Sequence, residues 1–401
     1  MGTYTELFRV RGLIRLVVAQ LLARLPAGMM SLGLLLHIQA QTGSWTNAGL
    51  VLAAVCVGQA IAGPTTSRLM GRFGMRIVLG TTLVITAACV VAFAFVPPVM
   101  AVYLPLGALA GLTTPPISSA VRTIYPTLVN SRQLGGLFSL DASAQEVIWV
   151  VGPVLIIFVA TTISTQLGVL MIGAVLLIGG TWFIGLPEVG RTRLPRSSRA
   201  IGKVLLKPPV ALATAIGFLL VAGYAALEVA VVAVYGHGRS ESGVLLAICA
   251  AGSLIGGFTF GHAPIGPWSS SRRMAIVVIG SAATLISTEF WWLAAALFVS
   301  GLGMAPVLAA NSAIASASVK FSDAPEAFGW LNTGGLVGAA LGSAAAGWAI
   351  DQVGTSGAFV IATVLAGLGA IVPAVWVKAH PDLRHGDVGP AADTAPVNLV
   401  G

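Results

Sequence analysis

A single arginine interrupts a long apolar run near the start of the chain. Residues 21–30 read LLARLPAGMM, and the apolar stretch around them, residues 13–38, is long enough to cross a bilayer. Arg24 would lie near the centre of the hydrocarbon, where a charged side chain costs about 2.5–3.5 kcal/mol on insertion scales. An arginine stays protonated at any accessible pH, so Arg24 can bind an anion or a partner carboxylate but cannot itself carry a proton.

Three carboxylates also fall inside apolar segments, and a carboxylate can carry a proton across a membrane. Glu146 lies at the depth of Arg24, and we expect the two to pair and to exchange their bond for a proton; the alternative is a static ion pair that fixes helix packing. Asp141 is expected to pair with Arg122, either as a gate or in the proton path. Glu228 either lines the cavity from the opposite side, in contact with a cationic substrate or a proton, or faces the outer water.

Amide and aromatic side chains inside the apolar segments are the other candidates for contact with a substrate. Amides can hydrogen-bond a ligand or bridge neighbouring helices, and a tryptophan can stack on a flat or cationic ligand or simply pack. The predicted substrate-binding set is Gln20, Arg24, Gln145, Trp149, Glu228, Asn311 and Asn332.

The composition defines what must position these residues. Of 401 residues 57% are hydrophobic and only 8% are charged, with a mean hydropathy of +0.94, whereas a soluble domain carries about 25% charged residues. The apolar runs are continuous rather than alternating, which predicts membrane-spanning helices and not a β-barrel. We expect an all-α membrane protein with twelve helices, at 12–37, 48–70, 76–97, 99–122, 134–160, 165–186, 208–235, 241–262, 273–290, 292–317, 327–350 and 357–377.

The basic residues predict the orientation of these helices. With the N-terminus inside, 19 of the 21 Lys and Arg residues fall on the cytoplasmic side, where membrane proteins retain them. Both termini are therefore expected in the cytoplasm, and the net charge of +8 needs no nucleic-acid partner. No cleavable signal peptide is expected before the first helix. Frequent Ala, Gly and Arg are typical of a high-GC bacterium, which predicts the cell inner membrane.

The chain divides into two similar halves. Residues 187–203 form the most basic interior stretch, and we predict a bundle of six helices at 1–186, a cytoplasmic linker at 187–207, a second six-helix bundle at 208–377 and a disordered cytoplasmic tail at 378–401. A shift of 194 positions places Gly58 on Gly252, and a shift of 190 places Gly111 on Gly301 and Gly152 on Gly342. Two pseudo-symmetric six-helix repeats are typical of secondary transporters, which bind substrate between the halves.

The loop after the second helix carries the most specific motif. Residues 67–76 read SRLMGRFGMR, which resembles the signature of the major facilitator superfamily: Leu69, Arg72, Gly74 and Arg76 match it, and Gly71 stands where an Asp is usual. The resemblance implies a cytoplasmic gate, which we assign to Arg68, Leu69, Arg72, Gly74, Arg76 and Arg122. Because the family's Asp helps to latch the two halves together, the latch here must be weaker or built differently.

A second motif lies on the fifth helix. Gly152 and Pro153 resemble the Gly-Pro core of a signature found in family members that work as antiporters. The arginine that drug and proton antiporters usually carry in the fourth helix is absent, since Gly107 occupies the equivalent position. The Gly-Pro pair at 152 and 153 favours export by exchange.

These observations predict a secondary active transporter that works as a monomer in the lipid bilayer and exports a small drug-like or metabolite molecule in exchange for protons. Proton-coupled uptake of a sugar or other small solute is the alternative, and a receptor or scaffold without transport activity is a second one. The sequence has no phosphate-binding loop, HExxH or paired CxxC motif, so we expect no ATP drive, no metal site and no cofactor. No nucleophile and base constellation is recognisable, so an enzyme is not expected.

Overall fold

The computed structural model describes residues 10, 12–192, 201–235, 240–260, 263–384 and 388–392, and within these ranges it is helical, with one isolated bridge between Lys320 and Ala391. The longer helices are α2 (Leu13–Thr42), α3 (Trp45–Phe73), α4 (Met75–Phe93), α5 (Met100–Leu112), α6 (Ile117–Leu128), α7 (Ser131–Thr162), α8 (Thr165–Gly185), α10 (Pro208–Tyr235), α11 (Ser240–Phe260), α12 (Ser269–Ala283), α13 (Phe290–Ala317), α14 (Ala324–Val353) and α15 (Thr355–Val375). A short helix, α9 (Pro187–Arg191), follows α8, and two 3-10 turns, η1 (Phe321–Asp323) and η2 (Val377–Ala379), flank α14 and α15.

Eleven spans in the described chain are long and apolar enough to cross a membrane. The twelfth predicted span corresponds to α12, which has 15 residues and ends at Ala283 rather than at the predicted 290. The prediction of one continuous helix over 99–122 was wrong: α5 ends at Leu112 and α6 begins at Ile117. Pro115 and Pro116 stand between them, and proline cannot donate the hydrogen bond that would continue a helix.

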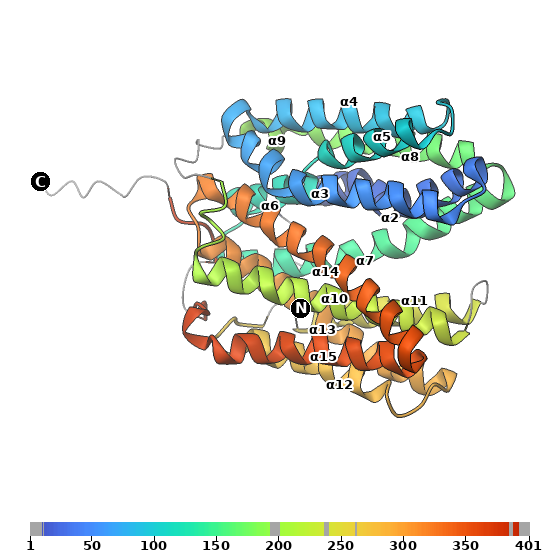
Figure 1. Ribbon diagram of the computed structural model, residues 1–401. Helices are drawn as coiled ribbons and strands as arrows, with labels where there is room; N and C mark the ends of the chain where they lie inside the picture. The colour runs from blue at the N-terminus through green and yellow to red at the C-terminus, as the bar shows by residue number, and fades with distance from the viewer. Residues whose placement is uncertain are drawn as a thin grey trace, which may run out of the picture.

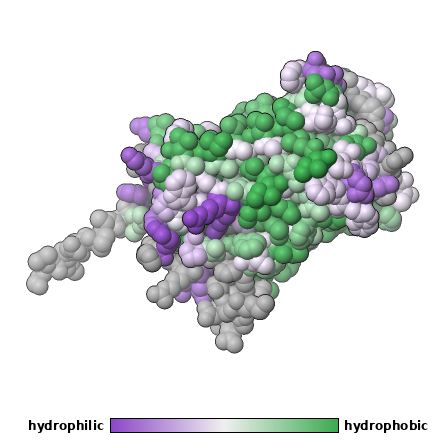
Figure 2. Space-filling view, turned by 90° about the horizontal axis from the view of Figure 1, so that it is seen from below, coloured by the Kyte–Doolittle hydropathy of each residue, from purple (hydrophilic) through white to green (hydrophobic). Residues whose placement is uncertain are grey.

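Figure 1 shows the helices in two groups, α2 to α8 in blue to green and α10 to α15 in yellow-green to red, here called the first and second half. Each half begins and ends at one end of the molecule, called the linker end, where α8 finishes and α10 starts; the opposite end is called the far end. In the view of Figure 2, exposed apolar side chains cover the middle of the surface, and hydrophilic ones gather towards the ends. This distribution suits a protein surrounded by lipid.

Equivalent glycines hold equivalent helices together in the two halves. A Cβ at Gly58 of α3 would lie 2.5 Å from the carbonyl oxygen of Ala108 on α5, and one at Gly252 of α11 would lie 2.3 Å from that of Phe298 on α13. Only a residue without a side chain allows such close approach of two helices. The predicted repeat is therefore visible in the packing: α3 meets α5 as α11 meets α13.

The two halves meet at the linker end and at mid-depth. Phe138 of α7 packs against Phe328 of α14 with ring centroids 6.1 Å apart, and both belong to one apolar cluster with residues of both halves. The Ser139 hydroxyl donates to the Gly257 carbonyl at 2.5 Å, and the Thr333 hydroxyl donates to the Ala60 carbonyl at 2.9 Å. These contacts close the linker end.

All four predicted domain segments fall partly outside the described residues. The residues concerned are 1–9 and 11 in the first bundle, 193–200 in the linker, 236–239 and 261–262 in the second bundle, and 385–387 and 393–401 in the tail. The described part of the tail lies against the loops of the second half: Leu383 donates its N–H to the Ile265 carbonyl at 2.8 Å, and Ala391 donates to the Val319 carbonyl at 3.0 Å.

Candidate functional site

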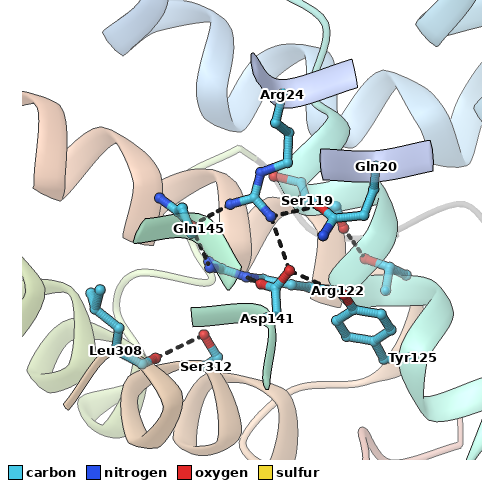
Figure 3. Close-up of polar contacts among 10 residues, drawn as sticks. Gln20, Arg24, Ser119, Arg122, Tyr125, Asp141, Gln145, Leu308 and Ser312 are labelled. Atoms are coloured by element: carbon cyan, nitrogen blue, oxygen red, sulfur yellow. Dashed lines mark hydrogen bonds and ion pairs between the residues drawn. The ribbon is translucent and has the colours of Figure 1, made fainter. Parts of the chain in front are cut away.

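A buried network of charged residues occupies the first half, about two fifths of the way along α2 and one third along α7. Arg24 donates from Nη1 to Oδ1 of Asp141 at 2.9 Å, and Arg122 of α6 donates from Nε to Oδ2 of the same carboxylate at 3.0 Å. The hydroxyl of Tyr125 donates to Oδ1 at 3.0 Å. The Asp141 side chain is fully buried, and those of Arg24 and Arg122 are 6% and 12% exposed. Figure 3 shows both guanidinium groups converging on the carboxylate.

Two of the predicted substrate-binding amides belong to the same network. The Gln20 side-chain oxygen accepts from Nη1 of Arg24 at 2.7 Å. The Gln145 side-chain oxygen accepts from Nη2 of Arg24 and, at 3.4 Å, from Nη2 of Arg122. Both amides present oxygen to the arginines, so within the described chain each side chain that hydrogen-bonds these two cations is an acceptor.

The predicted pair between Arg24 and Glu146 was wrong, whereas the predicted pair between Asp141 and Arg122 is confirmed. Glu146 follows Asp141 by five residues, which turns its side chain about 140° around the helix axis. Glu146 therefore lies on a different face of α7 from Asp141. Glu146 points to the second half, where it accepts a hydrogen bond from the Ser253 hydroxyl of α11 at 2.9 Å.

Glu146 thus lies where α7 meets the second half. Its partner Ser253 is buried on α11. Glu228, the glutamate of the second half that was predicted for proton coupling, lies on α10 one helical turn after Tyr224.

A cavity of about 190 Å³ adjoins the arginine network, between α2, α3, the α5–α6 turn, α7 and α14. Of the predicted substrate-binding residues, Arg24, Gln145, Trp149 and Asn332 line it, and Arg24 is the one charged residue among its described lining residues. Trp149 is 50% exposed. Asn332 comes from the second half, so the cavity lies between the halves.

The remaining predicted binding residues lie elsewhere. Gln20 is buried behind Arg24 and does not line the cavity. Glu228 is exposed and lines a separate groove between α10 and α14, with Ser343 and Ile350. Asn311 of α13 is 2% exposed, and within the described chain neither atom of its side-chain amide has a hydrogen-bond partner.

One residue of the predicted gate, Arg68, forms an ion pair between the halves at the linker end. Arg68 of α3 donates to Oε2 of Glu326 on α14 at 3.1 Å. Glu326, whose side chain is 1% exposed, also accepts from the backbone N–H of Gly202 at 2.8 Å and from Nε1 of Trp330 at 3.4 Å. Position 71 is a glycine, and the acid in this contact comes from the other half. No pattern in the sequence marks Glu326 for this, because its partner is 258 residues away.

The other motif residues of this loop stay within the first half. Gly74 separates α3 from α4 with φ +90°, a conformation that favours glycine. Arg76 donates to the Leu186 carbonyl at 3.1 Å, and Arg72 lies over the Phe73 ring at 5.1 Å from its centroid. Leu69 is 38% exposed. Arg122, also predicted for the gate, pairs with Asp141 as expected.

The Gly-Pro pair of the fifth helix marks the crossing of α7 and α2. A Cβ at Gly152 would lie 2.8 Å from the carbonyl carbon of Gly28, so neither helix can carry a side chain there. Pro153 follows inside α7. Gly342, the predicted repeat partner of Gly152, has the same role between α14 and α10, where a Cβ would lie 2.1 Å from the Ala222 carbonyl oxygen.

Comparison with known proteins identifies the family. The family model described as Major Facilitator Superfamily matches residues 16–288 and 258–399. The chain belongs to the major facilitator superfamily. It is therefore a membrane transporter with the twelve-helix, two-half fold of this superfamily, and not a member of an enzyme family.

One curated relative is the uncharacterized MFS-type transporter y4rN of Sinorhizobium fredii (strain NBRC 101917 / NGR234), which is 30% identical over 159 residues. The match spans 38% of this chain and 38% of that relative.

Solved structures share the fold at low identity. A bacterial homologue of the iron transporter ferroportin in its outward-facing state has a TM-score of 0.73 and 14% identity, covering 91% of this chain and 99% of that one. The proton:xylose symporter XylE, bound to 6-bromo-6-deoxy-D-glucose, has a TM-score of 0.70 and 13% identity, covering 94% and 97%. The human organic anion transporter MFSD10 (TETRAN) has a TM-score of 0.68 and 16% identity, covering 91% and 99%.

Proposed function

We propose that this superfamily member is a proton-driven exporter, which moves a small organic molecule out of the cell by alternating access and takes protons in exchange. The observation that carries the proposal is the contrast between two carboxylates on α7. Asp141 is held by two arginines, so its charge is compensated. Glu146 meets a hydroxyl, and among the described residues no cation contacts it. A carboxylate in apolar surroundings without a cation readily takes up a proton.

The position of Glu146 couples such a proton to movement of the halves. Its hydrogen bond to Ser253 joins α7 to α11, so any separation of the halves on this side must break that bond. Ionised Glu146 would need a polar partner at this depth, whereas protonated Glu146 can leave Ser253 at lower cost. Protonation would therefore permit the swing between the two states, and release of the proton on the other side would drive the transporter back.

We assign the linker end to the cytoplasm and the protein to the cell inner membrane, working as a monomer. Arg68, Arg76, Lys207 and Lys320 all lie at that end, as the retention of basic residues in the cytoplasm requires. Since the contacts between the halves close the linker end, the conformation described would then be the outward-facing one.

The proposal is tested by accumulation of fluorescent cationic, neutral and anionic dyes in efflux-deficient bacterial cells, with and without a protonophore. Wild type, Glu146→Gln and the matched control Asp351→Asn are compared. Asp351 is an exposed acid near the far end of α14, so its substitution removes a carboxylate away from Ser253. We expect wild type and control to lower dye accumulation only while the proton gradient exists, and Glu146→Gln to lose this effect.

Other outcomes would replace the proposal. Dye accumulation that rises with the proton gradient would show uptake by symport through the same cavity. Export that continues unchanged in Glu146→Gln would remove Glu146 from the coupling path.

A further inference from the structure

The arginine network carries an uncompensated positive charge. Arg24 and Arg122 contribute two positive charges, and Asp141 contributes the one negative charge that contacts them in the described chain. The amide oxygens of Gln20 and Gln145 and the Tyr125 hydroxyl stabilise this arrangement without adding charge. An unpaired buried charge is costly, so an anion that binds beside it would be stabilised.

Part of the Arg24 guanidinium is available to such an anion. The group has five N–H donors. Within the described chain three of them are used: two on Nη1, toward Gln20 and Asp141, and one on Nη2, toward Gln145. The Nε hydrogen and one Nη2 hydrogen remain as donors, and an arginine can bind a carboxylate through two of its N–H groups. Arg24 lines the cavity, so a ligand there can reach it.

The rest of the cavity lining fits one anionic group on an otherwise uncharged body. No acid occurs among its described lining residues, so no carboxylate on that wall would pair with a cationic ligand or repel an anion. Ile148, Trp149, Leu176 and Leu336 supply an apolar wall, and Gln59 and Asn332 can hydrogen-bond polar groups. At about 190 Å³ the cavity accepts a small ligand.

We propose that the transported substrate is a small organic anion, whose carboxylate binds Arg24 while its apolar body packs against Trp149. This inference deepens the proposed function, because it rests on this cavity being the transport site. It departs from the cationic drug-like ligand that the sequence allowed for Glu228 and Trp149. With the anion bound, the network and its ligand together are neutral, so the loaded site can be occluded between the halves without a buried net charge.

The test uses purified full-length protein in lipid nanodiscs and three sets of matched probes. Each set shares one body and differs in its head group: phenylacetate, phenylacetamide and phenethylammonium; hexanoate, hexanamide and hexylammonium; 3-phenylpropionate, its amide and its amine. Binding is measured as the shift in thermal unfolding followed by tryptophan fluorescence, at constant ionic strength. We expect the carboxylates to raise the unfolding temperature and their amide and ammonium partners to have a much smaller effect.

A matched pair of variants at Asn332 assigns this preference to the cavity. Asn332 is an exposed lining residue outside the arginine network, so its substitution leaves the ion pairs intact. Asn332→Asp places a negative charge in the cavity, and Asn332→Ala removes the amide without adding charge. The affinity ratio of carboxylate over amide should fall at least about tenfold in Asn332→Asp relative to Asn332→Ala.

The outcomes separate this inference from the proposed function. If ammonium or amide probes bind as well as the carboxylates, if no carboxylate in the panel binds, or if the two Asn332 variants behave alike, the anion assignment is overturned. If carboxylates bind as expected but cellular export ignores the protonophore, proton coupling fails and the substrate class stands. If export follows the proton gradient but the carboxylates do not bind, the substrate class fails and proton coupling stands.

Discussion

The two halves of this transporter each bury an arginine, and they use it differently. In the first half, Arg24 shares the Asp141 carboxylate with Arg122 and lines the cavity. In the second half, Arg273 of α12 donates to the main-chain carbonyls of Pro306 at 2.7 Å and Ala263 at 2.8 Å. One arginine belongs to a charged site between helices, whereas the other ties a helix start to its neighbours near the linker end.

The difference suggests a division of work between halves that share one architecture. The same glycine contacts join α3 to α5 and α11 to α13, but the buried charges near the cavity come from the first half. The second half contributes neutral partners there, the Ser253 hydroxyl for Glu146 and the Asn332 amide. We infer that the first half provides ligand recognition, and that the second half acts mainly as the body against which it moves.

The largest effect is expected from removing the negative charge that balances the two arginines of the first half. Asp141→Asn leaves two buried guanidinium groups facing a neutral amide, so we expect a loss of about 3–5 kcal/mol in the free energy of unfolding and no measurable transport. Thermal and denaturant unfolding in detergent, together with dye export in cells, provide the measurements.

The matched variant for this prediction is Arg273→Gln, which removes the buried arginine of the second half. It should also lower stability, because two carbonyls lose a charged donor, but the thermal shift caused by phenylacetate should persist. Equal loss of that shift in both variants would contradict the division between the halves.

A smaller effect is expected where the halves are alike. Gly152→Ala places a methyl group against the Gly28 backbone, which forces α7 away from α2, and we expect a destabilisation of about 1–3 kcal/mol. The control is Gly347→Ala in α14, where a Cβ meets nothing within 4 Å; there a gain of up to about 1 kcal/mol follows from helix propensity. Urea unfolding of both variants tests this. Equal free energies of unfolding would mean that α7 and α2 can move apart at their crossing without loss of stability.

These packing contacts are also where the sequence was most informative. The offsets that placed Gly58 on Gly252 and Gly152 on Gly342 correspond to equivalent helix crossings, because a repeated fold needs small residues at repeated positions. The apolar runs predicted the spans, and the prolines at 115 and 116, which divide α5 from α6, could have been used as a helix boundary.

The membership of the charged site was predicted, and so was the pair of Asp141 with Arg122, but Arg24 was assigned to the wrong carboxylate. Arg24, Asp141 and Arg122 were all selected because charge is costly in a membrane. Which carboxylate faces Arg24 depends on the rotation of α7, and membrane depth alone does not determine rotation. The Arg68 to Glu326 pair could not be predicted from the sequence for a related reason. It joins two helices that only the assembled halves bring together.

This pair provides a third prediction, on how the halves hold each other. Glu326→Gln weakens the contact of α14 with Arg68 and with the Gly202 N–H, each a charge-assisted hydrogen bond worth about 1.5–3 kcal/mol. We expect the linker end to open more often, seen as a longer distance between spin labels placed on α3 and α14 at that end. The control is Glu188→Gln, which removes a pair with Arg15 inside the first half and should leave the distance distribution unchanged.

The smallest expected effect concerns pH and lies at the linker end of the second half. His380 is 4% exposed, its Nε2 lies 2.9 Å from the Ser270 hydroxyl, and burial lowers the pKa of its imidazole, with Arg273 nearby acting in the same direction and Asp382 in the opposite one. The folded protein therefore resists protonation of His380 more than the unfolded chain, whose histidine has a pKa of about 6.5.

It follows that His380 stabilises the fold above that pH, and that its contribution is lost as the pH falls below about 6.5, because the unfolded state then binds the extra proton. For a single proton the slope cannot exceed about 1.4 kcal/mol per pH unit. Unfolding temperatures of wild type and His380→Gln, measured across this range, should converge or cross as the pH falls, since glutamine can bond Ser270 at any pH. Parallel curves would mean that the imidazole is protonated equally in the folded and unfolded states. The contact of His380 with Ser270 would then make no pH-dependent contribution to stability.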